Sequence, residues 1–173
     1  MKSSEVYELT TKGGASDFAT VVEICRSLGP YCLLGGLAVN CYVEPVYTLD
    51  ADFVVIASQT AALETQLVTR GFSVQTFPHS LNAQAPESEL RIQFTTDPRY
   101  QDFLGRAEER EVLGILVRVA ALKDVVQGKL WAHSDQQHRL SKPKKDELDL
   151  LRLGEADPAL RSKYPEELRK LLE

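Results

Sequence analysis

The chain has 173 residues, which is enough for one domain with a substantial buried core. Its 20 basic and 25 acidic residues give a formal net charge of −5, which argues against broad, sequence-independent binding to nucleic acid. The cysteines are odd in number and lie in apolar surroundings, which argues against a disulfide framework or a zinc site, and no apolar run reaches the roughly 18 residues of a membrane-spanning helix. We therefore expect a cytoplasmic protein with reduced thiols.

The first part of the chain predicts a helix followed by a short strand. Residues 1–14 are polar and end in Lys-Gly-Gly, so we expect a loose segment or a short strand there. From Asp17 onward, apolar residues recur at helical spacing until Gly29 and Pro30 stop the pattern. Residues 31–34 are apolar and predict a short buried strand.

A glycine pair follows this strand. Gly35 and Gly36 precede a short helix predicted over 37–43, which must end at or before Pro45 because a residue preceding proline avoids helical geometry. Glycine lacks a Cβ, so the backbone can approach a ligand closely, and a helix N-terminus favours phosphate. The pair is a candidate phosphate site, although a Gly-Gly pair alone is more often just a turn.

Two carboxylates lead into the next predicted strand, 52–57. Asp50 and Asp52 point to the same face if the strand includes both, because side chains alternate along a strand. Two like charges held so close are costly unless a cation lies between them, and oxygen ligands suit Mg²⁺ or Mn²⁺. We therefore expect a divalent cation on this pair, although an Asp-x-Asp alone is usually a solvated strand edge or a cap.

The remaining elements complete an alternating pattern. A helix and three strands are expected in the order 59–70, 72–77, 89–95 and 111–119, and then two helices are expected at 120–131 and 144–153. The proline-containing stretch 78–88 and the linker 132–143 are expected to be loops, and residues 158–173 an amphipathic helix. We expect residues 1–119 to form a core and 120–173 a helical segment packed on it as one compact unit.

The stretch from Gly35 to Asp52 resembles motif I of the nucleotidyltransferase superfamily, the fold typified by DNA polymerase β. It is most similar to the small bacterial branch that includes the AbiEii-type nucleotidyltransferases, which tends to have Gly-Gly-x-Ala and then Arg-x-Thr-x-Asp-x-Asp. The matching residues here are Gly35, Gly36, Ala38, Thr48, Asp50 and Asp52. Val46 stands where an arginine is common, which is a first departure from the pattern.

The resemblance implies an α/β (α+β) fold, in which helices flank a mixed β-sheet and a helical C-terminal segment follows. It also implies a Mg²⁺-dependent enzyme that moves a nucleoside monophosphate from a nucleoside triphosphate to an RNA, protein or small-molecule acceptor. Related toxins act on transfer RNA ends or on partner proteins, so the resemblance extends to a toxin–antitoxin or phage-defence setting with a protein partner.

Two further motifs match this family near the C-terminus. A family lysine that meets the nucleotide's phosphates is matched by Lys129, and a later arginine with Lys-Asp-x-x-Asp is matched by Arg139, Lys145, Asp146 and Asp149. Together with Asp50 and Asp52, the resemblance implies catalytic roles for Lys129 and Asp146. It assigns nucleotide binding to Gly35, Gly36, Thr48, Lys129, Lys145 and Asp149. A solvated surface lysine and a helix-capping aspartate remain open alternatives.

A second departure concerns the family's third catalytic carboxylate, whose position is matched by Gln93. A neutral amide cannot act as a general base and is a poor Mg²⁺ ligand. Glu89 and Asp97 share its face by parity, but each lies roughly 13 Å away along the strand. The alternative is therefore a degenerate nucleotidyltransferase fold that binds a nucleotide or a protein without chemistry. A carboxylate opposite Asp50 and Asp52 would favour the enzyme, and Gln93 alone would favour the alternative.

Overall fold

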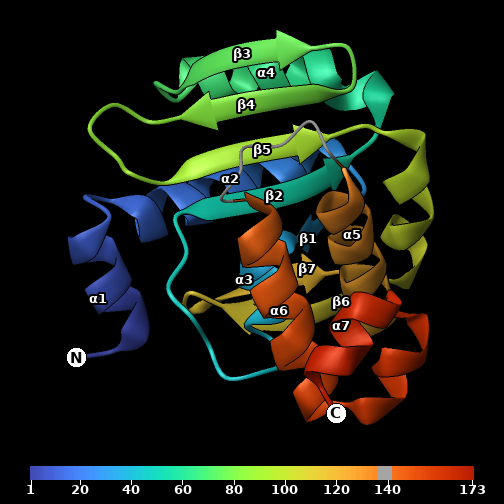
Figure 1. Ribbon diagram of the computed structural model, residues 1–173. Helices are drawn as coiled ribbons and strands as arrows, with labels where there is room; N and C mark the ends of the chain where they lie inside the picture. The colour runs from blue at the N-terminus through green and yellow to red at the C-terminus, as the bar shows by residue number, and fades with distance from the viewer. Residues whose placement is uncertain (136–141) are drawn as a thin grey trace.

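The computed structural model describes residues 1–135 and 142–173. Within these residues, seven strands form one mixed sheet in the order β3-β4-β5-β2-β1-β7-β6 (Figure 1). The strands are β1 (Tyr31–Leu34), β2 (Asp50–Val55), β3 (Ser73–Phe77), β4 (Ser80–Gln84), β5 (Arg91–Thr95), β6 (Glu108–Val112) and β7 (Ile115–Val119). Strand β2 is antiparallel to β1 and parallel to β5, so the sheet is mixed as expected.

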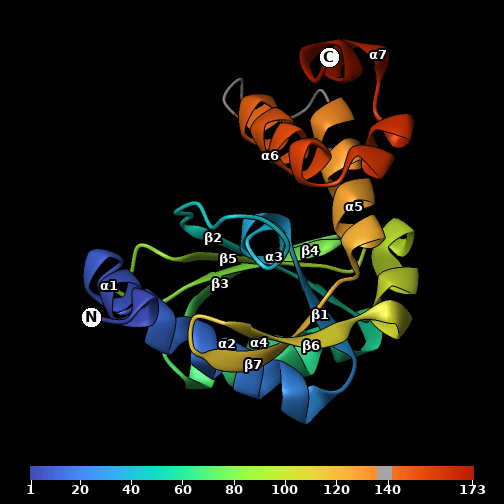
Figure 2. The same cartoon turned by 90° about the horizontal axis from the view of Figure 1, so that it is seen from below.

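Helices cover the sheet on both sides. The α-helices are α1 (Ser3–Thr10), α2 (Gly14–Leu28), α3 (Gly35–Val39), α4 (Thr60–Thr69), α5 (Leu122–Ser134), α6 (Lys142–Ala156) and α7 (Glu166–Leu171). The described residues also form three 3₁₀ segments: η1 (Ala57–Gln59), η2 (Pro98–Arg106) and η3 (Pro158–Lys163). Figure 2 shows α2 and α4 on one side and α5, α6 and α7 on the other. No helix of the described residues is long and apolar enough to span a membrane.

The core fixes which face of β2 points toward the helices of the C-terminal part. Phe53 of β2 is buried and stacks between Phe18 of α2, at 5.9 Å between ring centroids, and Phe94 of β5, at 5.5 Å. A shift of one residue would move these rings to the opposite face, so their burial specifies the register. Because side chains alternate along a strand, Asp50 and Asp52 project from the face of β2 opposite to that of Phe53.

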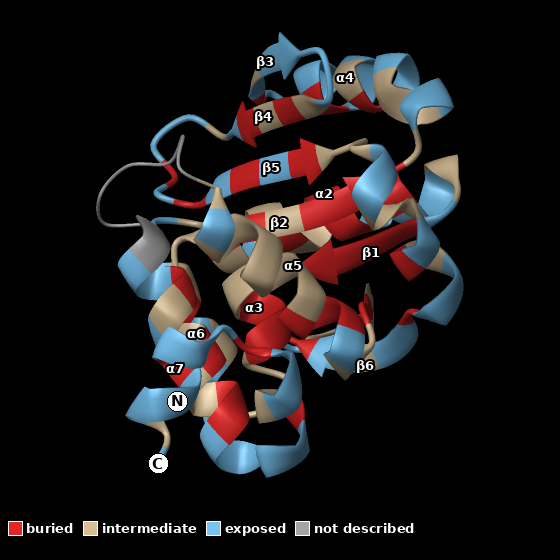
Figure 3. Cartoon of the chain, turned by 45° about the vertical axis from the view of Figure 1, so that its right-hand side comes forward, coloured by how far each residue is buried: buried red, intermediate tan, exposed pale blue. Residues whose placement is uncertain are grey.

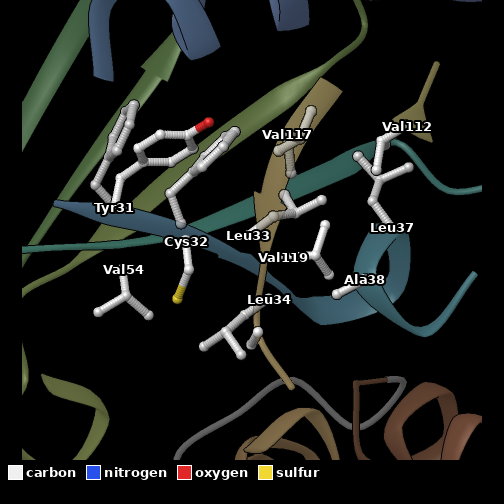
Figure 4. Close-up of a cluster of buried hydrophobic side chains, with 14 of the residues drawn as sticks. Tyr31, Cys32, Leu33, Leu34, Leu37, Ala38, Val54, Val112, Val117 and Val119 are labelled. Atoms are coloured by element: carbon white, nitrogen blue, oxygen red, sulfur yellow. The ribbon is translucent and has the colours of Figure 1, made fainter. Parts of the chain in front are cut away.

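Burial is concentrated in the central strands. In Figure 3, β1 is coloured as buried along its length, whereas the edge strand β3 is mostly exposed. Figure 4 shows side chains of β1, β7 and α3 packed together, among them Leu33, Val119 and Leu37. The end of β1, where Gly35 begins α3, is therefore held from several directions.

Most of the predicted elements are confirmed, but residues 1–14 and 78–88 were predicted wrongly. The first segment is not loose or a strand; it contains α1, whose Tyr7 is buried and donates a hydrogen bond from its hydroxyl to the Thr48 carbonyl at 2.7 Å. The second segment is not a loop throughout, because β4 lies within it and pairs with both β3 and β5. Tertiary packing and sheet pairing stabilise these short elements, and their local patterns are weak.

Two C-terminal predictions also need correction. The single strand expected over 111–119 is a hairpin of β6 and β7, whose turn is Leu113 at φ 49° and Gly114 at φ 85°. A leucine in the left-handed region is uncommon, so the apolar run conceals the turn. The helix expected over 158–173 is divided into η3 and α7 at Tyr164, which is extended before Pro165.

The expected linker 132–143 is shorter than predicted. Residues 132–134 extend α5, and 142 and 143 belong to α6. Arg139, which the resemblance matched to a family arginine, lies outside the described residues.

Candidate functional site

Asp50 and Asp52 both line one cavity of about 510 Å³. Strand β2 and the buried stack around Phe53 direct them to the same face, as the alternation predicted. The cavity extends from this face of the sheet to α6, which contributes Lys145, Asp146 and Asp149. The two carboxylates are thus neighbours in a polar cleft between the sheet and the C-terminal helices.

Gly35 lies against Asp52. Its φ is +70°, and a Cβ at this position would lie 2.2 Å from Asp52 Oδ2. Both the backbone conformation and the lack of space require glycine here. Gly36 is less constrained, because a Cβ there would come no closer than 3.4 Å to Thr48 Oγ1. Thr48 itself supports the loop, since its hydroxyl accepts a hydrogen bond from the Asp50 N–H at 3.3 Å.

The neighbouring strand presents a cation and an amide to the acid pair. The parallel register places Arg91 beside Asp50 and Gln93 beside Asp52. Arg91 Nε lies 2.8 Å from Asp50 Oδ1, and Lys145 Nζ lies 3.4 Å from Asp50 Oδ2. By the parity that puts Glu89 and Asp97 on the face of Gln93, Arg91 also lies on that face, but its contact with Asp50 depends on the pairing of β2 with β5 and could not be predicted from the sequence.

The two acidic alternatives to Gln93 are engaged elsewhere. Glu89 forms an ion pair with Lys12 at 3.2 Å, and Asp97 forms one with Arg99 at 3.0 Å. On the β5 side, the residue opposite Asp52 is Gln93, which is the arrangement expected for the non-catalytic alternative.

Lys129 forms the centre of a buried charge cluster between α5 and α6. Its ammonium lies 3.0 Å from Asp146 and 2.8 Å from Asp149, and its side chain is only 11% exposed. Asp146 and Asp149 are three residues apart, so they share one face of α6. Burial alone would lower the pKa of Lys129, but the charges of Asp149 and Asp146 outweigh it and raise that pKa overall. Lys129 is therefore charged at neutral pH.

A second cavity of about 480 Å³ adjoins the first. Four residues line both cavities: Asp52, Gln93, Lys129 and Asp146. The second cavity also contains Gly35 and an aromatic wall, in which Tyr100 meets Trp131 edge-on at 5.2 Å between ring centroids. Asp146 Oδ2 is buried and has no hydrogen-bond partner among the described residues. This oxygen belongs to a side chain at the junction of the two cavities.

The acid pair suits a divalent cation that takes its remaining ligands from the substrate and from water. In the described part of the chain, no group of three or more His, Cys, Asp or Glu side chains is arranged to hold a metal. Mg²⁺ is usually bound by one or two carboxylates together with substrate phosphates and waters. Asp50 and Asp52 supply that number of carboxylates in a cleft open enough for a substrate.

Comparisons with solved structures identify the fold. No protein-family model matches the chain, and no curated protein matches it. The antibiotic-resistance factor ANT(2'')-Ia matches with a TM-score of 0.65 and 17% identity over 93% of this chain and 91% of that chain. The lincosamide adenylyltransferase LnuA, solved with lincomycin bound, matches with a TM-score of 0.57 and 13% identity over 82% of this chain and 96% of that one.

A nucleotidyltransferase-like protein from Paracoccidioides brasiliensis also matches, with a TM-score of 0.53 and 15% identity over 91% of this chain and 92% of that one. At these identities the likeness concerns the fold. The chain therefore has the nucleotidyltransferase fold that the sequence motif predicted, and the closer resemblance to the AbiEii-type branch stays a prediction.

Proposed function

We propose that this protein is a Mg²⁺- or Mn²⁺-dependent nucleotidyltransferase that moves a nucleoside monophosphate from a nucleoside triphosphate to a hydroxyl group. The observation that carries this proposal is the arrangement of Asp50 and Asp52 on one face of β2, in a cleft bordered by α6. The buried ammonium of Lys129 in the same cleft supports it, because triphosphate binding needs positive charge. The shared fold supports it further.

In the proposed reaction, the acceptor oxygen forms a bond to the α-phosphorus while the bond from that phosphorus to the bridging β-phosphate oxygen breaks. The products are the nucleotidylated acceptor, pyrophosphate and one proton. Asp50 and Asp52 would hold the cation, which would supply positive charge to neutralise the phosphate oxygens. Lys129 directs two N–H groups to Asp146 and Asp149 and offers its third to the leaving pyrophosphate.

Asp146 has two proposed roles. Its Oδ1 accepts a hydrogen bond from Lys129 at 3.0 Å and so positions the ammonium. Its buried Oδ2, which has no partner among the described residues, is available to accept the hydroxyl proton. This role matters because Gln93 cannot take a proton in place of a carboxylate.

The two adjoining cavities suit two substrates that meet at Asp52, Lys129 and Asp146. We propose a small-molecule acceptor, because about 480 Å³ lies within the usual size of small-molecule sites and the net charge of −5 disfavours RNA. LnuA was solved with the small molecule lincomycin and ANT(2'')-Ia with adenylyl-2''-tobramycin. An RNA or protein acceptor in a toxin–antitoxin setting is the alternative from the sequence resemblance.

The test is transfer of label from α-phosphate-labelled nucleoside triphosphates to separate pools of hydroxylated small molecules, transfer RNA and protein. We expect Mg²⁺-dependent labelling of a small molecule, reduced at least about 100-fold in Asp52→Asn because that change removes a charged ligand. Asp102→Asn is the matched control, since Asp102 is exposed and lies outside both cavities. Full incorporation by Asp52→Asn would reject the proposed metal role, and labelled RNA would reject the proposed acceptor.

A second candidate function is nucleotide binding without turnover. It is favoured by the pairing of Gln93 with Asp52 and of Arg91 with Asp50, which leaves no carboxylate on the β5 side of the acid pair. Isothermal titration with ATP and Mg²⁺, followed by a pyrophosphate-release assay, separates the two functions. Binding with no release from any acceptor pool would support this second candidate.

A further inference from the structure

Arg91 occupies a position that the sheet itself determines. Strands β2 and β5 run parallel, and their register pairs Asp50 with Arg91 and Asp52 with Gln93. Paired residues on neighbouring strands project from the same face with their Cβ atoms roughly 5 Å apart. The guanidinium is therefore within reach of the acid pair through the backbone pairing of two central strands.

The contact between Arg91 and Asp50 uses both carboxylate oxygens. Arg91 Nε lies 2.8 Å from Oδ1, and Nη2 donates to Oδ2 at 3.3 Å. Such a two-point contact fixes the guanidinium plane more tightly than a single ion pair. Lys145 also contacts Oδ2, at 3.4 Å, but it comes from α6 and its side chain is 59% exposed. Arg91 is thus the cation that belongs to the same rigid sheet as Asp50.

Arg91 also has donors left for a substrate. A guanidinium carries five N–H groups, and two of its nitrogens face Asp50 through one N–H each. The remaining three have no partner among the described residues, and Arg91 lines the first cavity together with Asp50, Asp52 and Lys145. Arginine matches phosphate geometry and keeps its charge at any physiological pH.

Phosphoryl-transfer sites in polymerases commonly hold two divalent ions, which need several carboxylates between them. Here β5 supplies Arg91 and Gln93 beside the acid pair, and a second ion on that side would lie against a guanidinium. Resting on the proposed function, we infer that Arg91 takes the place of one divalent cation: it stays on Asp50, contacts the nucleotide's phosphate oxygens, and leaves the cleft with a single metal ion.

The first experiment counts ions. The folded chain is titrated with Mn²⁺ in the presence of a saturating non-hydrolysable nucleoside triphosphate analogue, and bound ions are measured by electron paramagnetic resonance. We expect one Mn²⁺ per chain. Two Mn²⁺ per wild-type chain, or none, would overturn the inference.

The second experiment changes Arg91 and measures Mn²⁺ affinity without nucleotide. We expect Arg91→Met to bind Mn²⁺ at least about tenfold more tightly, because the competing charge on Asp50 is gone. Arg91→Lys, which keeps the charge, should remain within about threefold of the wild type. Arg26→Met is the matched control: the Arg26 side chain is 41% exposed, against 48% for Arg91, and pairs with Glu109, and neither Arg26 nor Glu109 lines either of the two cavities.

An unchanged or weakened affinity in Arg91→Met would contradict the inference, provided that circular dichroism shows the variant to be folded. The label-transfer assay tests the proposed function independently of the number of bound Mn²⁺ ions. One bound ion without label transfer would reject the enzyme and leave the role of Arg91 standing. Two bound ions with label transfer would reject the role of Arg91 and leave the enzyme standing.

Discussion

The geometry of the acid pair depends on Gly35, which lies against Asp52. Its left-handed backbone at φ +70° brings the start of α3 against Asp52, and no room remains for a side chain. A substitution here would both strain the backbone and move the carboxylate. Stability and metal binding should therefore change together at this position.

We predict that Gly35→Ala lowers the free energy of unfolding by about 2–3 kcal/mol, from left-handed strain and from overpacking. It should also weaken Mn²⁺ binding at least about tenfold, because Asp52 must shift. Urea denaturation and Mn²⁺ titration measure the two effects.

Gly71→Ala provides the matched control for this substitution. Gly71 also has a positive φ, +91°, but a Cβ there would meet nothing within 4 Å. Gly71→Ala should lower the free energy of unfolding only by the left-handed strain, about 1–2 kcal/mol, and should bind Mn²⁺ as the wild type does. Wild-type Mn²⁺ affinity in Gly35→Ala would show that the close approach does not position Asp52.

At the scale of elements, Lys129 joins α5 to α6. The two helices contribute one ammonium and two carboxylates to a cluster in which Asp146 is 4% and Asp149 15% exposed by side chain. Arg152, also on α6, donates to Asp149 at 2.9 Å and to the Glu44 carbonyl, which links the helix to the loop before β2. The placement of α6 over the sheet depends on these contacts.

We predict that Lys129→Met lowers the free energy of unfolding by about 3–5 kcal/mol, because it leaves the buried carboxylate of Asp146 without its counter-charge and Asp149 with Arg152 alone among the described residues. Adding Asp146→Asn should recover part of this loss, and a double-mutant cycle by chemical denaturation measures the coupling. The control Lys170→Met breaks an exposed pair with Glu166 and should cost less than about 1 kcal/mol. A similarly small loss for Lys129→Met would contradict the structural role of the cluster.

At the scale of the whole molecule, buried thiols make stability depend on pH. Burial raises the pKa of Cys25 and of Cys32 to about 12. In the unfolded chain, the pKa of a cysteine thiol is about 8.5. Above that pH the folded state therefore holds protons that the unfolded state has released. The contribution of the thiols is complete below pH ~8.5 and is lost as the pH rises toward 12.

We predict that the thermal unfolding midpoint falls steadily between about pH 8.5 and 9.5, a window in which unfolded tyrosine, with a pKa of about 10, is still mostly protonated. The variant with Cys25→Ala and Cys32→Ala should be less stable at pH 7, because two core side chains are truncated, yet its midpoint should fall less steeply across this window. Differential scanning calorimetry at several pH values provides both slopes. Equal slopes in the two proteins would contradict the assignment.

The sequence by itself determined the features that depend on local periodicity. The helical spacing after Asp17 predicted α2, and the parity of Asp50 and Asp52 predicted that they share a face. The Gly-Gly and Asp-x-Asp motifs predicted the nucleotidyltransferase fold, which the comparisons confirmed. Predictions from periodicity and parity hold in the structure because the direction of each side chain follows from the local backbone conformation.

Only the tertiary structure decided which residues meet across elements. The contact of Arg91 with Asp50 depends on the parallel register of β5 with β2, and the cluster around Lys129 depends on the packing of α5 against α6. The hairpin turn at Leu113 is not indicated by the local sequence and follows from the pairing of β6 with β7. Register and helix packing follow from burying distant side chains together, and that physical coupling leaves no periodic pattern along the chain.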